Sequence, residues 1–305
     1  MILCCGEALI DMILNLDGTF APHAGGAVFN TAIGLGRQGV DVGLLSGISE
    51  DLFGKMLVQS LKDSGVSTAH LIRSSRPSTL AFVVVKDGKA SYAFYDENTA
   101  GRMLFPSSEP ITLPQEVNAL FFGGISLAVE PCADFYVDLL KVNAKNRFVM
   151  VDPNIRPQFI SNEVRYRARL TEVLGLTDVL KISDEDLLWI DPTPENLDIK
   201  IDKLLSSGPK LICLTLGGEG VNLYSQDGLI VKTLPPSVQV VDTVGAGDAF
   251  NAGFLSCLSK NKSLDKTSIA AMTDHDLQSI LNFATAFASD TVTRQGSNPA
   301  WYFEE

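Results

Sequence analysis

The sequence predicts an α/β fold in which a mostly parallel central sheet is covered by helices on both faces. Strand-like and helix-like segments alternate over most of the 305 residues, as in repeated βαβ units. Apolar residues make up 46% and charged residues 20%, which is typical of a globular chain with a large core. Two adjacent strand-like runs interrupt the alternation and predict a small accessory sheet.

The first part of the chain supplies two strands and two helices of the expected pattern. Residues 2–10 are apolar and predict the first strand, and residues 42–46 predict the second. The spacing of apolar residues indicates helices at 27–37 and 51–64, with Asp51 suited to cap the second helix. Further strands, separated by helical segments, are expected at 119–122, 148–151, 179–182 and 211–216.

The accessory sheet is expected from residues 80–85 and 90–95, which are strand-like and joined by an Asp87-Gly88 turn. Residues 12–20 are expected to add one or two strands. Because open α/β sheets bind ligands at their carboxyl edge, we expect the accessory sheet to be a lid over that edge. An exposed edge strand invites pairing with a second copy, which leaves a homodimer through the lid as one alternative.

Composition excludes several classes of protein. The net charge of −12 argues against nucleic acid or an anionic membrane as the main partner. No apolar run approaches the roughly 18 residues that a membrane span needs. The first residues also lack the basic start of a signal peptide. The five cysteines are scattered along the chain, which predicts buried free thiols and a cytoplasmic protein.

The most informative motif is DTVGAGDAFNAGF, at residues 242–254. Gly245, Ala246 and Gly247 have little or no side chain, so their N–H groups can approach an anion closely. A helix that begins there adds the charge of its N-terminus, about half an elementary charge, which makes the turn a phosphate or oxyanion site. Asp248 lies inside the turn, and a carboxylate at that place indicates a group with a proton to remove.

Other residues fit a sugar site, although each has an ordinary alternative. The Gly25-Gly26 turn enters a helix, and Asn30 can offer both a donor and an acceptor to sugar hydroxyls one turn later. Asp11 can accept hydrogen bonds from vicinal hydroxyls at the end of the first strand. A packing turn with a solvated Asn, and an Asp that initiates a turn, explain the same residues about equally well.

Three further clusters follow expected strands, at places where loops carry function. Residues 152–156 bring Asp, Asn and Arg together, with a solvated turn as the alternative. Residues 181–186 form an acidic run that can hold hydrated magnesium or can simply begin a helix. The glycine turn at 215–220 suits the phosphates of a nucleotide or a plain connection between strands.

The sequence gives no support for either of two common nucleotide-binding motifs, the dinucleotide motif and the P-loop. Residues 34–39, GLGRQG, match the spacing of the dinucleotide motif, but they fall late in a helical segment. The motif needs a strand before its first glycine, so helix packing explains these glycines better. The chain has no GxxxxGK[ST] motif, and any use of ATP would therefore be without a P-loop.

Taken in chain order, Asp11, the Gly-Gly-x-x-x-Asn turn, TLGGEG and DTVGAGD resemble the PfkB, or ribokinase-like, family of carbohydrate kinases. The resemblance covers about residues 2–299. It implies a single domain, 1–305, with a ribokinase-like three-layer α/β/α fold. It also implies a small β-sheet lid formed by about 12–22 and 78–105.

Within the family, DPNIRP and residues 94–104 look most like bacterial fructokinases. This likeness implies ATP-dependent phosphorylation of a primary hydroxyl of a ketohexose, with D-fructose as the first choice. The 2-keto-3-deoxygluconate kinases share the layout and often an arginine at the position of Arg156, so they and other sugar or nucleoside kinases of the family stay open. Rivals from other classes are an NAD-dependent dehydrogenase that uses GLGRQG and a non-catalytic sugar sensor, which the intact GAGD disfavours.

The resemblance also assigns roles to residues. Asp248 would be the catalytic base, and Gly245, Ala246 and Gly247 would form the anion hole. The residues that would hold the sugar are Asp11, Gly25, Gly26, Asn30 and Arg156. Those that would lie along ATP are Lys181, Ser183, Thr215, Gly217, Gly220 and Asn282. A monovalent cation, usually potassium, would be bound by Asp242, Thr291 and the backbone carbonyls of Val244, Arg294 and Gly296.

One departure from the family concerns magnesium. The family often has Asn-x-x-Glu after the strand that is expected to end here at Ile182, whereas this chain has Ser183-x-x-Asp186. Asp is one methylene shorter than Glu, which puts a magnesium role for Asp186 in doubt. Glu185 competes for the same role.

Overall fold

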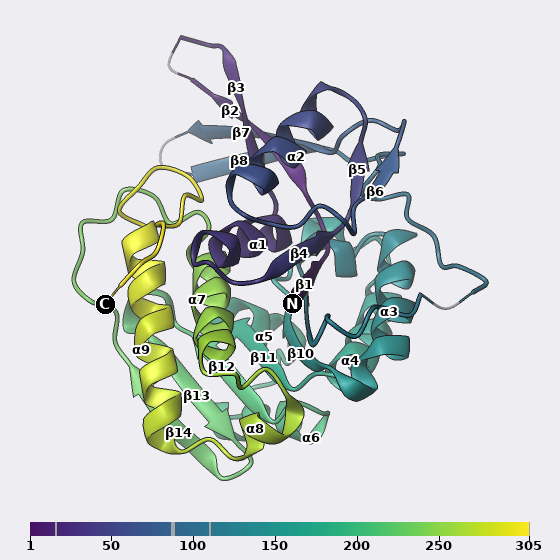
Figure 1. Ribbon diagram of the computed structural model, residues 1–305. Helices are drawn as coiled ribbons and strands as arrows, with labels where there is room; N and C mark the ends of the chain where they lie inside the picture. Colours follow the sequence, from purple (N-terminus) through teal and green to yellow (C-terminus); the bar gives the residue numbers. More distant parts are fainter. Residues whose placement is uncertain (16, 87–88, 110, 305) are drawn as a thin grey trace.

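The computed structural model describes residues 1–15, 17–86, 89–109 and 111–304. In that part of the chain, the eight strands of the central sheet are β1 (Ile2–Cys5), β4 (Val42–Leu45), β9 (Ala119–Gly123), β10 (Phe148–Asp152), β11 (Val179–Ser183), β12 (Leu211–Thr215), β13 (Val221–Ser225) and β14 (Gly228–Thr233). Their order is β14-β13-β12-β11-β10-β9-β1-β4 (Figure 1). The strands from β12 to β4 in this order are parallel, and β13 and β14 add an antiparallel edge. The predicted mostly parallel sheet is confirmed.

Helices cover both faces of this sheet (Figure 1). One layer contains α1 (Ala27–Arg37), α7 (Ala246–Lys260) and α9 (Asp274–Thr291), and the other contains α3 (Cys132–Asn143), α4 (Glu163–Leu174), α5 (Asp184–Ile190) and α6 (Leu197–Ser206). Alternate residues of β1 point into two separate buried clusters, Ile2 and Cys4 into one and Leu3 and Cys5 into the other. This alternation explains why a strand buried on both faces is apolar at every position.

A separate small sheet lies at the top of Figure 1. Its strands are β2 (Leu9–Leu14), β3 (Phe20–Gly25), β7 (Leu80–Lys86) and β8 (Lys89–Tyr95), in the order β3-β2-β7-β8. The predicted accessory sheet is thus present. Its strands β2 and β3 overlap only the two ends of the stretch 12–20 that was expected to add strands, because β2 begins earlier and β3 ends later. The predicted Asp87-Gly88 turn lies outside the described residues.

The prediction of one strand at 2–10 is wrong, because the chain leaves the central sheet after β1 and enters the small sheet as β2. Gly6, at the break, has no room for a side chain. A Cβ atom there would lie 2.5 Å from Val28 Cγ2 and 2.7 Å from Ser126 Oγ. Asp11 therefore lies in the small sheet, and not at the end of the first central strand.

The remaining elements are short or lie outside the two layers. They are β5 (Gly47–Ser49), β6 (Ile72–Ser74), α2 (Leu52–Asp63), α8 (Lys266–Ala270) and the 3-10 turns η1 (Gly124–Leu127), η2 (Ala144–Asn146), η3 (Pro157–Phe159) and η4 (Gly217–Glu219). Helix α2 has the predicted cap, since Asp51 accepts a 2.7 Å hydrogen bond from the Gly54 N–H. The helices predicted at 27–37 and 51–64 are both confirmed.

The glycines of GLGRQG serve helix packing, as predicted. Gly34 and Gly36 lie inside α1. A Cβ atom on Gly34 would lie 2.6 Å from the Ala252 Cβ of α7, and one on Gly36 would lie 2.1 Å from the Ser64 carbonyl oxygen. These positions are in the middle of a helix and not in a strand-to-helix turn, so the segment is not a dinucleotide loop.

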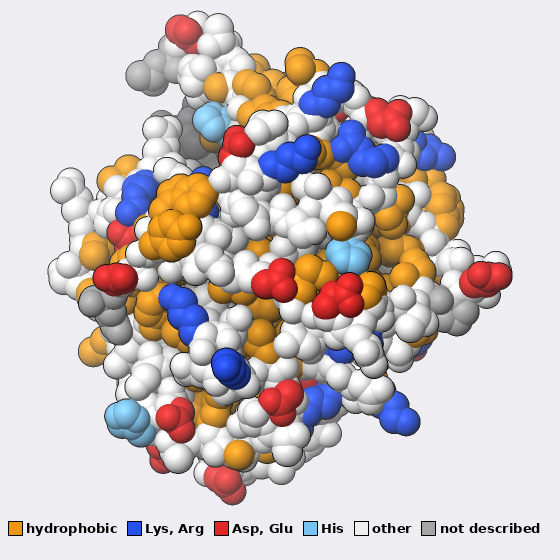
Figure 2. All heavy atoms as spheres, viewed as in Figure 1, with side chains coloured by type: hydrophobic (Ala, Val, Ile, Leu, Met, Phe, Trp, Pro, Cys, Tyr) orange, Lys and Arg blue, Asp and Glu red, His pale blue; other side chains and the backbone are white. Residues whose placement is uncertain are grey.

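Charged and apolar side chains are interspersed over the face in Figure 2. Among the described residues, no helix combines the length and the apolar character that crossing a membrane requires. Cys4, Cys5, Cys132 and Cys213 are buried. The predicted burial of these thiols is confirmed.

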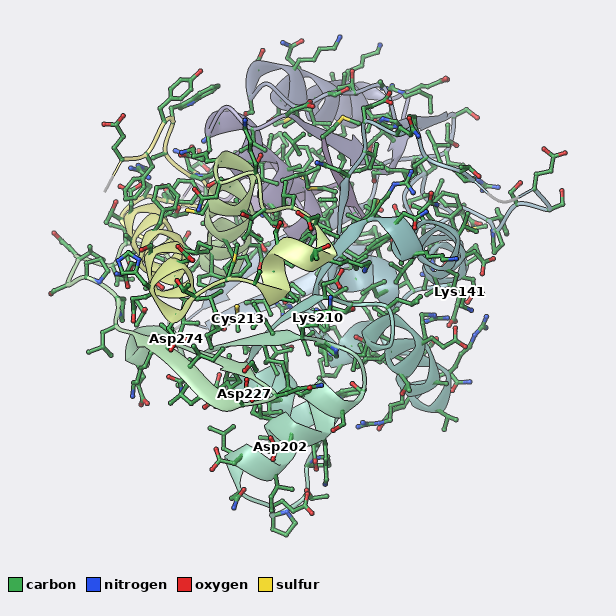
Figure 3. All side chains as sticks on the ribbon, turned by 60° about the horizontal axis from the view of Figure 1, so that its bottom comes forward. Lys141, Asp202, Lys210, Cys213, Asp227 and Asp274 are labelled. Atoms are coloured by element: carbon green, nitrogen blue, oxygen red, sulfur yellow. The ribbon has the colours of Figure 1, made fainter. Side chains whose placement is uncertain are left out.

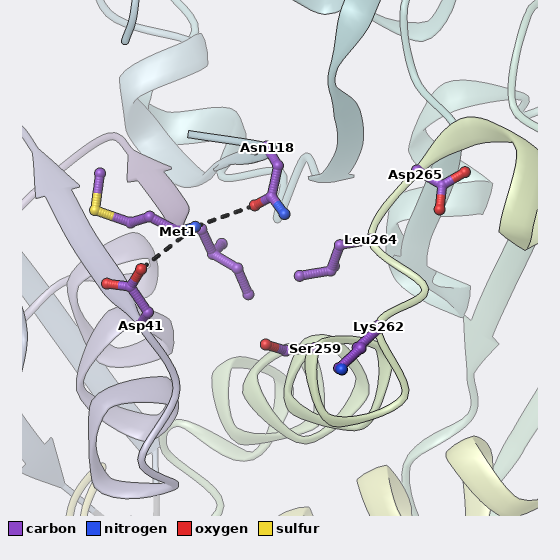
Figure 4. A pocket seen from close by; sticks show the side chains of 8 residues that line it. Met1, Asp41, Asn118, Ser259, Lys262, Leu264 and Asp265 are labelled. Carbon is purple, nitrogen blue, oxygen red and sulfur yellow. Dashed lines mark hydrogen bonds and ion pairs between the residues drawn. The ribbon is translucent and has the colours of Figure 1, made fainter. Parts of the chain in front are cut away.

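A cavity of about 310 Å³ opens at the amino ends of β1 and β9. Its lining includes Met1, Asp41, Asn118 and Lys262, and the Met1 ammonium donates a 3.2 Å hydrogen bond to Asn118 Oδ1 (Figure 4). The motifs of the sequence analysis contribute no residue to its lining. The motifs that contain Asp152, Ser183 and Thr215 lie instead at the carboxyl ends of β10, β11 and β12.

Candidate active site

The DTVGAGD motif forms the start of α7, beside the carboxyl ends of the parallel strands. Gly245 is the N-cap residue, with a left-handed φ of 80°, and a Cβ atom there would lie 2.2 Å from Ser297 Oγ. Only glycine combines this conformation with this closeness. No described side chain caps α7, and the Ala246 N–H donates to the Thr243 carbonyl at 3.3 Å. The next N–H groups of the first turn, those of Gly247 and Asp248, face the position where a helix N-terminus binds an anion.

Asp248 lies in the first turn of α7 and is 7% exposed. Its Oδ2 accepts a 2.9 Å hydrogen bond from Asn30 Nδ2, which joins α7 to the first turn of α1. Burial raises the pKa of Asp248 to about 7, and the Asp152 carboxylate acts in the same direction, while the Asn30 hydrogen bond opposes both. A carboxylate with a pKa near neutral pH is well matched to general-base catalysis.

A buried triad of Asp152, Lys181 and Asn251 lies beneath the first turn of α7. Asp152 Oδ2 accepts hydrogen bonds from Lys181 Nζ at 3.0 Å and from Asn251 Nδ2 at 2.7 Å. Burial by itself would lower the pKa of Lys181, but the Asp152 and Asp186 carboxylates outweigh it and raise the pKa. The sequence analysis did not single out Asn251, although its place one turn after Asp248 was a signal.

The predicted sugar residues of the small sheet come together at the entry to α1. Asp11 is half-buried, and burial raises its pKa to about 6. Gly25 is the last residue of β3 and lies directly beside Asp11. A Cβ atom on Gly25 would lie 2.2 Å from Asp11 Oδ2, so this position has no room for a side chain. Gly26 caps α1 with a φ of 110°. Arg156 is exposed, and its Nη1 donates to the Ile155 carbonyl at 3.1 Å.

Glu7 is a residue of this region that was not predicted from the sequence as part of the site. Its Oε1 accepts the Ala27 N–H at 3.2 Å, and its Oε2 accepts the Ser126 N–H at 3.3 Å. Its carbonyl accepts the Phe29 N–H at 3.2 Å. Glu7 therefore links η1 to the start of α1, the helix that contains Asn30. Burial raises the pKa of the Glu7 carboxyl group.

The residues predicted to lie along ATP are found in β11, in and after β12, and in α9. Gly217 begins η4 and Gly220 directly follows it, with φ values of 54° and 94°. Thr215 Oγ1 donates to the Ile182 carbonyl at 3.2 Å. Asn282 lies in α9, where its Oδ1 accepts hydrogen bonds from Thr233 Oγ1 at 3.1 Å and Gln278 Nε2 at 2.8 Å.

Asp242 joins two loops near the start of α7. Its Oδ1 accepts the Val244 N–H at 3.0 Å, and its Oδ2 accepts the Gly296 N–H at 2.9 Å. Thr291 donates its hydroxyl to the Phe287 carbonyl at 3.0 Å and is fully buried within α9. The Arg294 guanidinium pairs with Asp290. The fold thus brings the Asp242 carboxylate close to the backbone N–H groups of Val244 and Gly296. The cation role of these residues stays a prediction.

The acidic run forms the start of α5. Asp186 and Ser183 make a capping box, with a 3.0 Å hydrogen bond from the Ser183 N–H to Asp186 Oδ2. The Asp186 Oδ1 accepts the Ile155 N–H at 2.8 Å, and Glu185 is exposed. The described residues contain no cluster of three His, Cys, Asp or Glu side chains that can hold a metal. A magnesium ion here would therefore rely mainly on nucleotide phosphates and water.

Comparison with known proteins agrees with this geometry. Residues 1–301 match the pfkB family of carbohydrate kinases. The chain belongs to this family. It is therefore an ATP-dependent carbohydrate kinase with the ribokinase-like fold, and the predicted family and enzyme class are confirmed.

Named relatives of this kinase include fructokinases. The chain is 44% identical to a fructokinase of Rhizobium leguminosarum bv. trifolii, over 91% of this chain and 86% of that protein. It is 31% identical to a probable fructokinase-7 of Arabidopsis thaliana, over 98% of this chain and 89% of that protein. A fructokinase from Xylella fastidiosa, solved with bound ATP, superimposes with a TM-score of 0.88 at 29% identity and covers 97% of this chain and 93% of that one.

Proposed function

We propose that this kinase transfers the γ-phosphoryl group of ATP to a primary hydroxyl group of D-fructose. The main support is the place of Asp248, a buried carboxylate with a pKa of about 7 in the open first turn of α7. A base and an array of N–H donors then lie within one helical turn. Phosphoryl transfer needs mainly this kind of alignment and charge stabilisation.

In the proposed reaction, Asp248 accepts the proton of the attacking hydroxyl as the oxygen bonds to the phosphorus. The bond between the γ-phosphorus of ATP and the oxygen that bridges it to the β-phosphorus breaks, and ADP leaves with the electron pair on that oxygen. The N–H groups of the first turn of α7 stabilise the charge that develops on the transferred group. Magnesium bound with ATP would neutralise charge on the phosphates. General-base help of this kind is typically worth about 10²–10⁴-fold in rate.

The identity of the sugar rests on the fructokinase of Rhizobium leguminosarum, which is 44% identical to this chain. Release of ADP, measured by a coupled assay, should be fastest with fructose in a panel that also contains tagatose, ribose, adenosine and 2-keto-3-deoxygluconate. A higher kcat/KM with 2-keto-3-deoxygluconate would move the assignment to that kinase. Release of ADP with none of the five would contradict the proposed reaction.

A dehydrogenase and a sugar sensor are tested in the same preparation. A kinase should melt at a higher temperature with a non-hydrolysable ATP analogue and magnesium, and NAD should have no effect. Stabilisation by NAD alone would favour the dehydrogenase. Stabilisation by fructose without any ADP release would favour the sensor.

We also propose that potassium activates the enzyme. The support is Asp242, whose carboxylate lies between the Val244 and Gly296 loops at the start of α7. Replacement of potassium chloride by tetramethylammonium chloride at equal ionic strength should lower kcat several-fold, and Asp242→Asn should remove the difference between the two salts. Equal rates of the unmodified enzyme in both salts would contradict a potassium site.

The small sheet is proposed to be a lid and to pair with a second copy in a homodimer. Its exposed side chains include Leu14, Phe20 and Tyr95, and Phe82 packs edge-on against Phe20 and Tyr95 with ring centroids 5.0 and 5.4 Å apart. Burial of these rings would favour association. Light scattering should give twice the mass of one chain. A monomer at micromolar concentration would contradict the dimer.

A further inference from the structure

Asp152 is a buried carboxylate to which the proposed reaction gives no role. It is the last residue of β10 and is 1% exposed. One of its oxygens, Oδ2, accepts both hydrogen bonds of the triad, from Lys181 and Asn251. Its other oxygen, Oδ1, is buried without a partner among the described residues. Leaving a carboxylate oxygen unpaired is costly, which indicates that the position is kept for a purpose other than stability.

The triad is in direct contact with the first turn of α7. Asn251 lies one turn after Asp248 on this helix, so its hydrogen bond holds α7 to the end of β10. On the other side, a Cβ atom on Gly247 would lie 3.1 Å from Lys181 Nζ, which places the ammonium against the middle of the anion-hole turn. Lys181 has three N–H groups, and Asp152 accepts from it with one oxygen.

Besides burial, which raises the pKa of Asp248, one hydrogen bond and three charged side chains act on it. The hydrogen bond from Asn30 and the Lys181 ammonium lower the pKa, and the Asp152 and Glu7 carboxylates raise it. On the far side of the triad, the negative charge of Asp186 raises the pKa values of Lys181 and Tyr166.

We propose that Asp152 is a positioning residue for phosphoryl transfer, which sets both the place of the first turn of α7 and the direction of the Lys181 ammonium. Asp152 does this through the two hydrogen bonds that its Oδ2 accepts, from Lys181 and from Asn251. The inference rests on the proposed kinase reaction. The inference adds to that reaction a role for the end of β10, which would help to align Asp248.

Asp152→Asn tests the proposal, because it keeps the shape of the side chain and removes its charge. We expect kcat at pH 8 to fall by about tenfold or more, with KM for ATP and fructose changed by less than about threefold, since alignment acts on the transition state. The acid limb of the pH–rate profile should move to lower pH by about half a unit or more, because a neighbouring negative charge is lost. Lys181→Met should move the same limb to higher pH.

Asp178→Asn is the matched control. Asp178 is also buried, 3% exposed, and also pairs with lysines, Lys266 at 2.6 Å and Lys210 at 3.6 Å. It precedes β11 at the amino end of the sheet, and Lys210 lies on that side of the molecule in Figure 3. This variant should lose stability and keep the acid limb of the unmodified enzyme. A kcat of Asp152→Asn within about threefold of the unmodified enzyme, with an unmoved acid limb, would overturn the proposal.

A second variant and a second measurement keep the test decisive. If Asp152→Asn does not fold, Asn251→Leu removes the other half of the link with little change in volume, and it should show the same loss of kcat. The pH dependence of the melting temperature needs no turnover. Between pH 5 and 8 the unmodified protein should lose stability as Asp248 ionises, and Asp152→Asn should lose less. An equal loss would overturn the inference, whereas the absence of ADP release from the unmodified enzyme would overturn the proposed reaction instead.

Discussion

Asp248→Asn should fold normally and lose nearly all turnover, with kcat reduced by about 10²-fold or more. The amide oxygen of the new Asn can still accept the hydrogen bond from Asn30 Nδ2. The amide group cannot accept the proton of a sugar hydroxyl. The KM values should change little, because the lost interaction belongs to the transition state. The measurement is the rate of ADP release with fructose at saturating ATP. A variant with more than about a tenth of the normal activity would rule out Asp248 as the base.

The same variant should be more stable than the unmodified protein at pH 8. The pKa of Asp248 is raised from its ordinary value of 3.8 to about 7 by burial, so the folded state binds the proton more tightly than the unfolded state. The stability that the protonated form provides is fully present below pH 3.8 and is lost as pH rises through about 7. Asn stays neutral and avoids this loss. Melting temperatures at pH 5 and 8 check the sign and also show that the variant is folded.

Gly245→Ala should damage both activity and stability. The backbone there has a φ of 80°, which costs a residue other than glycine about 1–2 kcal/mol. The new Cβ atom would also lie 2.2 Å from Ser297 Oγ, so the start of α7 must move. Displacement of a reacting group by about 1 Å can cost about 10²-fold in rate, and we expect kcat to fall at least tenfold.

Gly228→Ala separates strain from displacement. Gly228 begins β14 with a φ of 98°, and a Cβ atom there meets no heavy atom within 4 Å. This control carries the backbone strain without the clash, so it should lower the melting temperature by less than Gly245→Ala and leave kcat unchanged. If both variants keep full activity, the position of the α7 turn is not critical for the reaction.

The position of the α7 turn was predictable because its residues are contiguous in the sequence. Gly245, Ala246, Gly247 and Asp248 combine, in a single motif, small residues that leave room for an anion and an acidic residue. The parallel sheet was predictable for a similar reason, since each buried strand is a local apolar run. The antiparallel β13–β14 edge was not singled out, because it lies between a glycine turn and a loop.

The contacts that shape the site depend on residues far apart in the chain. Asp152 and Asn251 meet across 99 positions, and Asn30 and Asp248 across 218. A single sequence contains no signal for such pairs. Glu7 was missed for the same reason, since its hydrogen-bond partners lie in α1 and η1. The crowding that leaves no room for a side chain at Gly6 is likewise visible only in the folded chain.

Phosphorus NMR of the reaction product tests the central claim most directly. After incubation with ATP, magnesium and fructose, the unmodified enzyme should give a phosphomonoester signal that is split into a triplet by the two protons of a CH₂–O–P group. This triplet identifies a phosphorylated primary hydroxyl. A doublet from a CH–O–P group, or a spectrum that contains only ATP, would contradict the account.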